Sequence, residues 1–315
     1  MSSTEQSSPP PAPSRRRWRR GRSAYPRRER RLAIAFLVPA VVLVAVLIYF
    51  PIGRVIVSSV TAQVPLAPGR EFIGLERYGD LATSATFWDV VRNSLVWTGG
   101  VVVLQNIAGL GAALLLNQGL PAQRLSRVIL LIPWVLPGVA AALLWRFIYD
   151  PQLGLLNALL QTAGAIDSGI AWLGSSSTAM GAVILAAVWK GFPFSMVMYL
   201  AALQGVQRDH IEAAMMDGAG AWRRFRNVIV PSISGVIRLN LLLTTVFTFN
   251  YFDMIWVATR GGPLDATHIF PTYIFQLGFG ELQFDRAATY GVVAALILAV
   301  AGYLYIKELR PQESV

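Results

Sequence analysis

Polar and aromatic side chains interrupt two of the long apolar stretches of this 315-residue chain. One stretch contains Trp189 and Lys190, and the other contains Asn250, Tyr251 and Asp253. Such groups are costly in hydrocarbon and usually face the interior of a helix bundle or a cavity. Aromatic faces beside amide, carboxylate and hydroxyl groups suit a sugar, whose ring faces stack while its hydroxyls take hydrogen bonds. These five residues are therefore candidates for lining a solute pathway, although Lys190 and Asp253 could instead pair and hold helices together.

Enzymatic chemistry has little support in the sequence. The two lysines, Lys190 and Lys307, both lack the glycine-rich context that a phosphate-cradling P-loop requires. The two histidines, His210 and His268, are far apart, and the absence of cysteine excludes disulfides and thiolate sites. We therefore expect no catalytic residue, no metal site and no cofactor in this chain, and favour transport with the energy supplied elsewhere.

The elements that must position these residues are transmembrane helices. The chain is 55% hydrophobic and only 14% charged, whereas soluble domains carry about 25% charged residues. Several apolar runs reach the roughly 20 residues that cross a bilayer as a helix. The sequence thus predicts an all-α integral membrane protein with six transmembrane helices, near 32–58, 89–116, 127–149, 178–204, 232–258 and 286–306.

Two further features concern these spans. The first apolar run is too long for a signal peptide and lacks a cleavage site, so it is expected to be retained. Prolines within spans predict kinks and close packing, because neighbouring helices must satisfy the freed carbonyls; they are Pro39, Pro133, Pro137 and Pro193.

The charge distribution sets the orientation. Residues 1–31 hold ten arginines against two glutamates, and we expect them to form a disordered basic cytoplasmic tail. An RNA or anionic-lipid contact is the alternative for this tail. Arginines also gather in the predicted loop 205–231, whereas the loops 59–88, 150–177 and 259–285 are richer in acidic residues. By the positive-inside rule both termini are cytoplasmic, including a short C-terminal tail at 307–315.

A polar segment from Glu212 to Pro231 separates two apolar runs. It begins with good helix formers, breaks at Gly218, and resumes with several arginines before Pro231. This pattern predicts a short helix that projects from the membrane toward a partner. A helix lying on the inner leaflet fits less well, because Glu, Asp and adjacent alanines make a poor lipid-facing surface.

The same segment resembles the EAA loop of binding-protein-dependent type I ABC importers. The residues that match the family pattern are Glu212, Ala213, Ala214, Asp217, Gly218, Ala219, Phe225, Ile229 and Pro231. Further matches to the sugar-type permeases of this family occur in order along the chain, at Phe72–Tyr78, Phe87–Thr98, Trp145–Asn157 and Thr259–Thr267. The resemblance covers about residues 32–306, which would form one six-span permease domain.

The resemblance implies a function and partners. The chain would be a permease subunit of an ATP-driven carbohydrate importer in the cytoplasmic membrane of a prokaryote, with a glycerol-phosphate-type solute as the alternative. A second homologous permease, two ABC ATPase subunits that bind ATP and Mg, and an extracytoplasmic solute-binding protein would complete the complex. The segment 205–231 would be a coupling loop, in which Glu212 engages a basic residue of the ATPase and Gly218 permits a sharp turn. A stand-alone secondary transporter would leave this loop without a function, and no nucleic-acid partner is expected.

Overall fold

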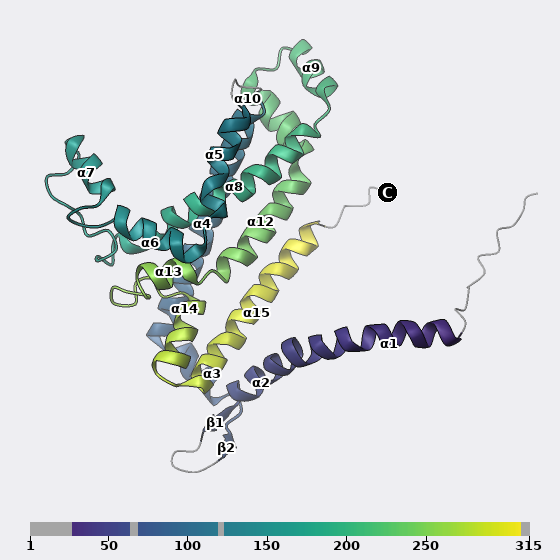
Figure 1. The fold of residues 1–315 in the computed structure, drawn as a ribbon, viewed down its shortest axis with the longest axis vertical. Helices are drawn as coiled ribbons and strands as arrows, with labels where there is room; N and C mark the ends of the chain where they lie inside the picture. The colour runs from purple at the N-terminus through teal and green to yellow at the C-terminus, as the bar shows by residue number, and fades with distance from the viewer. Residues whose placement is uncertain (1–26, 64–68, 119–122, 310–315) are drawn as a thin grey trace, which may run out of the picture. The chain divides into compact units, whose positions relative to one another are not determined.

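The computed structural model describes residues 27–63, 69–118 and 123–309, and nearly all of its regular structure is helical (Figure 1). Contacts divide the chain into residues 1–52 and residues 53–315. Most of the predicted N-terminal tail, at 1–26, and the residues 310–315 of the predicted C-terminal tail lie outside the described residues. The helices are α1 Arg27–Val44, α2 Phe50–Ser59, α3 Glu76–Thr83, α4 Ala85–Leu116, α5 Gln123–Val135, α6 Gly138–Ile148, α7 Leu155–Thr162, α8 Ala179–Gln204, α9 Arg208–Met216, α10 Ala221–Arg224, α11 Val230–Ser232, α12 Ser234–Phe249, α13 Asp253–Ala258, α14 Phe270–Phe275 and α15 Phe284–Leu309, with π-helical turns η1 Ala45–Tyr49, η2 Phe225–Ile229 and η3 Gln276–Gly280.

The first apolar segment is helical throughout. Helix α1, the turn η1 and α2 follow one another from Arg27 to Ser59, and Ala35–Ser59 forms an apolar stretch of 25 residues. At about 1.5 Å per residue this stretch is long enough for a hydrocarbon layer of about 30 Å. The residues Arg27–Arg31, placed in the tail by the sequence, are already helical, because Arg and Glu are good helix formers.

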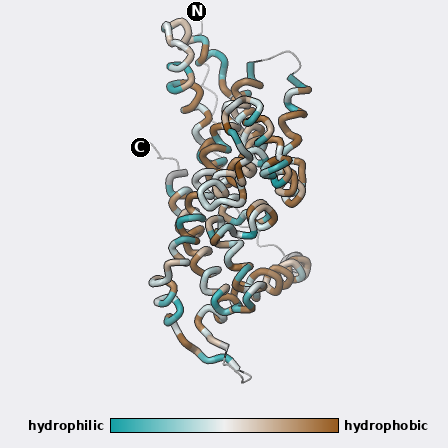
Figure 2. The backbone as a smooth tube through the Cα atoms, turned by 90° about the vertical axis from the view of Figure 1, so that its left-hand side faces the viewer, coloured by the Kyte–Doolittle hydropathy of each residue, from teal (hydrophilic) through white to brown (hydrophobic). Residues whose placement is uncertain are grey.

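Three more helices are long and apolar enough to cross a membrane, namely α4, α8 and α15. Their bounds agree with the predicted segments 89–116, 178–204 and 286–306 to within four residues at each end. Figure 2 shows hydrophobic residues along most of the helices, as expected for elements that face lipid or one another.

The third and fifth predicted spans are not continuous helices. Residues 127–149 are divided between α5 and α6, which meet at an angle of 98° beside Pro137. Proline lacks the N–H that would continue the hydrogen bonds of α5. Residues 232–258 are divided between α12 and α13, because the chain leaves the helix at Asn250, whose amide bonds the Val246 carbonyl at 2.9 Å. A further bend of 70° separates Ala221–Ser232 from α12. In the described part of the chain four helices are thus long and apolar enough to cross a membrane, and up to six spans result if each bent pair counts as one.

Helices α4 and α8 form the centre of residues 53–315 and pack side by side in the same direction. A Cβ atom on Gly109 of α4 would lie 2.5 Å from the Ser195 Cβ of α8, and one on Gly191 would lie 2.3 Å from the Gln105 Oε1. Gly109 therefore lets the helix backbones approach closely, as small residues do in membrane helix pairs, and Gly191 leaves room for the Gln105 side chain.

A buried polar network joins these two helices to α12. The Asn106 amide donates to the Thr244 hydroxyl at 3.2 Å, and its oxygen accepts hydrogen bonds from Tyr199 and from Asn240. All four side chains are buried. Because unpaired polar groups are costly in such surroundings, this network fixes the relative register of three helices.

The end of residues 53–315 farthest from α9 in Figure 1 carries a small β-hairpin that the sequence analysis did not foresee. Strands β1 Thr61–Gln63 and β2 Arg70–Phe72 are antiparallel, with Thr61 opposite Phe72. Asp285 at the start of α15 forms ion pairs with Arg70, at 3.2 Å, and with Arg77, at 3.5 Å. These ion pairs fasten the hairpin and α3 to the last long helix.

Candidate functional site

The predicted coupling segment, residues 205–231, contains two short helices joined by a tight turn. Helix α9 ends at Met216, and Gly218 follows in the left-handed conformation with φ of 74°. The Ala219 N–H bonds the Ala214 carbonyl at 2.9 Å, and the Gly218 N–H bonds the Met215 carbonyl at 3.0 Å. This pair of bonds is the Schellman arrangement, in which glycine supplies the backbone angles that other residues avoid.

A side chain from the second helix holds this turn. The Arg224 guanidinium donates to the Ala219 carbonyl at 2.8 Å. The sharp turn expected at Gly218 is therefore present, and it sets the direction in which α10 leaves α9.

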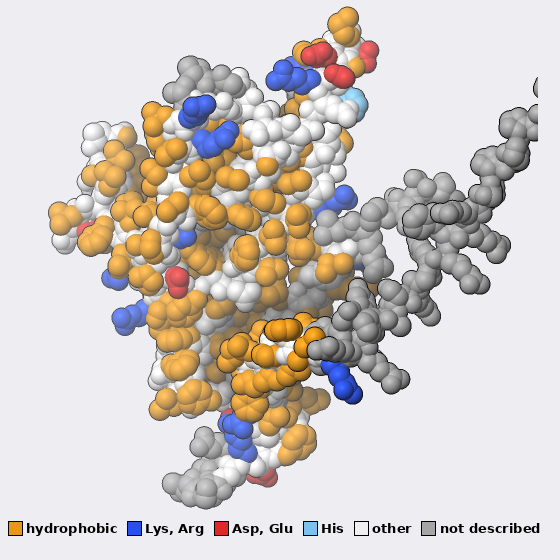
Figure 3. Space-filling view, turned by 45° about the vertical axis from the view of Figure 1, so that its right-hand side comes forward, with side chains coloured by type: hydrophobic (Ala, Val, Ile, Leu, Met, Phe, Trp, Pro, Cys, Tyr) orange, Lys and Arg blue, Asp and Glu red, His pale blue; other side chains and the backbone are white. Residues whose placement is uncertain are grey.

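The surface of α9 is largely uncovered. No residue of α9 is buried, and Met216 is 89% exposed, while Trp222 of α10 is 71% exposed. Glu212, Ala213 and Asp217 are exposed as well. Neither carboxylate forms an ion pair with any residue that the structure describes. Figure 3 shows acidic and hydrophobic side chains together at the end of the molecule where α9 lies. Exposed large apolar groups beside unpaired carboxylates are typical of a protein-binding surface.

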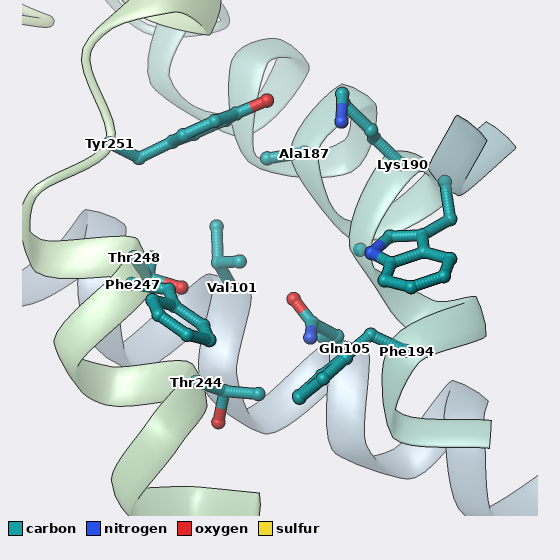
Figure 4. A pocket seen from close by; sticks show the side chains of 11 residues that line it. Val101, Gln105, Ala187, Lys190, Phe194, Thr244, Phe247, Thr248 and Tyr251 are labelled. Carbon is teal, nitrogen blue, oxygen red and sulfur yellow. The ribbon is translucent and has the colours of Figure 1, made fainter. Parts of the chain in front are cut away.

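A cavity of about 340 Å³ lies between α4, α5, α8, α12 and the residues that follow α12. Aromatic and hydrogen-bonding side chains share its wall (Figure 4). The lining residues are Val101, Gln105, Trp134, Ala187, Lys190, Gly191, Phe194, Thr244, Phe247, Thr248 and Tyr251. A concave, mostly apolar site with a few polar groups is the usual form of a small-molecule site.

Tyr251 is the polar group of this cavity that most clearly lacks a protein partner. Its hydroxyl is buried and has no hydrogen-bond partner among the described residues. The ring stacks on Trp97 with centroids 6.2 Å apart, and the Trp97 N–H bonds the Thr248 carbonyl at 2.9 Å. Because an unsatisfied buried hydroxyl is costly, a ligand that reaches it from the cavity would supply the missing hydrogen bond.

Two of the five predicted pathway residues, Lys190 and Tyr251, line the cavity. Trp189 instead packs into the neighbouring apolar core and contacts Trp145 edge to face, with centroids 5.7 Å apart. Asn250 is exposed and caps the end of α12, and Asp253 lies against Gly138 of α6. Lys190 and Asp253 form no ion pair within 4.0 Å.

The α4 side of the cavity was missed by the sequence analysis. Gln105 of α4 lines the cavity and donates to the Ser195 hydroxyl at 3.2 Å. The signal was present, since Gln105 and Asn106 are adjacent polar residues inside a long apolar run. Among the described residues, no group of three or more His, Asp or Glu side chains is placed to hold a metal ion.

The family described as "Binding-protein-dependent transport system inner membrane component" matches residues 105–306 of this chain. The chain belongs to this family. It is therefore a permease component, and the matched residues include both the cavity wall from Gln105 onward and the coupling segment.

Named relatives cover most of the chain. The trehalose/maltose transport system permease protein MalF of Thermococcus litoralis is 33% identical over 85% of this chain and 88% of its own length. The sn-glycerol-3-phosphate transport system permease protein UgpA of Yersinia pestis is 32% identical over 88% of this chain and 92% of its own length.

A crystal structure shares the permease fold. It is that of a bacterial ABC transporter involved in the import of the acidic polysaccharide alginate, and it matches with a TM-score of 0.77 at 20% identity. The match covers 91% of this chain and 98% of that one. The chain thus has the fold of a type I ABC importer permease.

Proposed function

We propose that this chain is one permease subunit of an ATP-driven ABC importer for a carbohydrate, resident in the cytoplasmic membrane of a prokaryote. It acts beside a second, homologous permease and two ABC ATPase subunits, which bind ATP and Mg. An extracytoplasmic solute-binding protein delivers the solute. The trehalose/maltose permease among the relatives supports the carbohydrate class.

The observation that carries this proposal is that α8 belongs to both functional regions. Its middle residues Ala187, Lys190 and Phe194 line the cavity, and its end at Gln204 leads within four residues into α9. From Lys190 to Gln204 the helix rises about 20 Å at 1.5 Å per residue. A movement imposed on α9 therefore reaches the cavity through one helix, without an intervening flexible linker.

The cavity suits a sugar for the reasons that apply to polyhydroxylated ligands. Trp134, Phe194 and Tyr251 supply ring faces, while Gln105 and Thr248 supply hydrogen-bonding groups (Figure 4). An apolar wall with a small number of placed polar groups fixes orientation without excessive desolvation cost.

The coupling role is assigned to Glu212, Ala213, Ala214, Asp217, Gly218 and Ala219. The ATPase subunit receives α9 in a groove, where Glu212 meets a basic side chain and the turn at Gly218 fixes the path of the chain. In this arrangement the arginine-rich end of residues 53–315 is cytoplasmic, the hairpin end is extracytoplasmic, and the six spans of residues 32–306 place both termini inside.

A phosphate ester is the second candidate solute, and Lys190 is the observation that favours it. Lys190 is the charged residue among those that line the cavity, and a cation there would attract a phosphate. Two other cations do not line the cavity: Arg92 lies nearer the start of α4, and Arg146 donates to the Val257 carbonyl at 3.4 Å. The relative UgpA supports this alternative, because its name gives sn-glycerol 3-phosphate, a phosphate ester, as the transported solute.

The experiment compares two charge reversals on α9 in the purified complex. Glu212→Lys should abolish solute-stimulated ATP hydrolysis while the permease still inserts. Asp209→Lys is the matched control, because Asp209 is also acidic and exposed in α9 and makes the same change of charge. Stimulation is measured with maltose, trehalose and sn-glycerol 3-phosphate, which separates the two candidate solutes. Equal stimulation in both variants would refute the coupling role of Glu212.

A further inference from the structure

A second space, which is lined mainly by polar residues and is called the hollow below, lies where the central helices α4 and α8 begin. Its volume is about 510 Å³, against about 340 Å³ for the cavity described above. It is formed where α4 and α8 begin and where the loop between α13 and α14 folds over them. The lining residues are Asp89, Arg92, Asn93, Val96, Ser176, Ser177, Met180, Leu264, Asp265 and Ala266.

The loop over this hollow is held in a costly conformation. Leu264 and Asp265 are consecutive left-handed residues, with φ of 49° and 60°. Left-handed backbone in residues other than glycine costs on the order of 1–3 kcal/mol each and persists where the surroundings impose it, often at functional sites. Here the Asn93 amide donates to the Asp265 carbonyl at 3.1 Å and ties the loop to α4.

The hollow and the cavity lie along the same pair of helices. On α4, Asn93 and Val96 line the hollow, whereas Val101 and Gln105 line the cavity. From Val96 to Gln105 the axial rise is about 14 Å at 1.5 Å per residue. On α8 the order is the same, because Met180 lines the hollow and Lys190 lines the cavity.

An apolar core separates the two spaces. Trp97 follows the hollow residue Val96 directly, is fully buried, and packs with Val183 and Ile184 of α8. The Trp97 ring also stacks on the ring of Tyr251, which lines the cavity. The Trp97–Tyr251 pair therefore lies between residues of the hollow and residues of the cavity.

We propose that the hollow is an outer solute-binding site, which holds one unit of the sugar before it passes Trp97 into the cavity. The inference rests on the proposed function, which supplies the solute class and the direction of movement. The wall offers carboxylate, guanidinium, amide and hydroxyl groups, a mixture of donors and acceptors that matches sugar hydroxyls. The hollow is larger than the cavity, so a solute that fits the cavity is not excluded from the hollow by size.

The absence of cysteine from the sequence provides a direct test. Single cysteines are introduced into the complete complex, with partner subunits that lack reactive cysteines, and their rates of modification by N-ethylmaleimide are measured. Ser177→Cys reports on the hollow and Phe247→Cys reports on the cavity. Gln161→Cys on α7 is the matched control, because Gln161 is exposed and lines neither space.

The probe is whichever of maltose, trehalose and sn-glycerol 3-phosphate slows modification of Phe247→Cys. Added at ten times its dissociation constant for the hollow, a sugar probe should slow modification of Ser177→Cys about tenfold and leave Gln161→Cys unchanged. Protection of Phe247→Cys without protection of Ser177→Cys would overturn the outer site alone. Protection of Ser177→Cys by the solute-binding protein but not by sugar would also overturn it, and would assign the hollow to a protein partner. If none of the three compounds protects Phe247→Cys, the proposed function fails, and this inference fails with it.

Discussion

The left-handed conformation of Gly218 gives the most quantitative prediction. Its φ of 74° terminates α9, and a Cβ atom at this position would meet no other atom within 4 Å. A substitution here therefore acts through the backbone alone, without a steric clash. An alanine in this conformation costs about 1–2 kcal/mol, and a β-branched residue costs more.

This cost lowers the fraction of molecules in which the turn at Gly218 is formed. A penalty of about 1–2 kcal/mol shifts a two-state equilibrium by roughly 5- to 30-fold. Gly218→Ala should lower solute-stimulated ATP hydrolysis by up to that factor when the ATPase subunit is limiting, and Gly218→Val should lower it further. Gly218→Asn should retain most of the activity, because asparagine tolerates the left-handed region.

The assay is the rate of solute-stimulated hydrolysis in the reconstituted complex, titrated with ATPase subunit. Gly205→Ala is the matched control, since Gly205 lies in the same segment with φ of −85°, which alanine adopts freely. If Gly218→Ala, Gly218→Val and Gly205→Ala all behave like the wild type, the turn at Gly218 has no part in coupling.

Three further predictions concern the cavity, the central helix pair and a buried histidine. Tyr251→Phe should raise the solute concentration for half-maximal ATPase stimulation about 2- to 12-fold with Tm unchanged, whereas Tyr199→Phe, which breaks the buried network, should lower Tm. Gly109→Ala should destabilise the protein to thermal unfolding by about 1–3 kcal/mol, because its Cβ would meet the Ser195 Cβ and the Met196 backbone of α8, whereas Gly111→Ala on the same helix meets no atom within 4 Å and should not. Burial lowers the pKa of His268 from 6.5, against the opposing effect of nearby carboxylates, so the unfolded chain binds the proton more tightly than the folded chain. Tm should therefore fall as the pH is lowered through and below 6.5, and His268→Gln should weaken this dependence on pH.

Each of these predictions has a contrary outcome. A fall in Tm for Tyr251→Phe would mean that its hydroxyl has a structural partner. Equal stabilities for the two glycine variants would contradict the close approach of α4 and α8. An unaltered pH profile in His268→Gln would assign the loss of stability in acid to other groups.

The long helices were predictable because hydropathy alone determines them. The bounds of α4, α8 and α15 follow from apolar runs that are long enough to cross a membrane as helices. The interruptions are less visible, because Pro137 and Asn250 sit within otherwise apolar stretches and only tertiary packing decides whether a helix bends or ends there. The hairpin depends on ion pairs to Asp285, more than 200 residues along the chain, which no local pattern reveals.

The candidate site was predictable in part for a related reason. The predicted coupling segment is contiguous, so its helix, its glycine turn and its exposure can all be anticipated from one stretch of sequence. The cavity is assembled from four helices and Tyr251, and the sequence indicates polar residues but not the direction in which each points. Tyr251 turns into the cavity and Asn250 caps a helix end, although the two are adjacent.

The most direct test of the central claim is the composition of the native complex. The tagged chain is recovered in mild detergent from its own cells, and the co-purifying proteins are identified by mass. The proposed function predicts an ABC ATPase subunit and a second permease, with the ATPase lost and the second permease retained when Glu212→Lys and Gly218→Val are combined. Recovery of the chain alone, still able to move solute across liposomes without ATP, would contradict it.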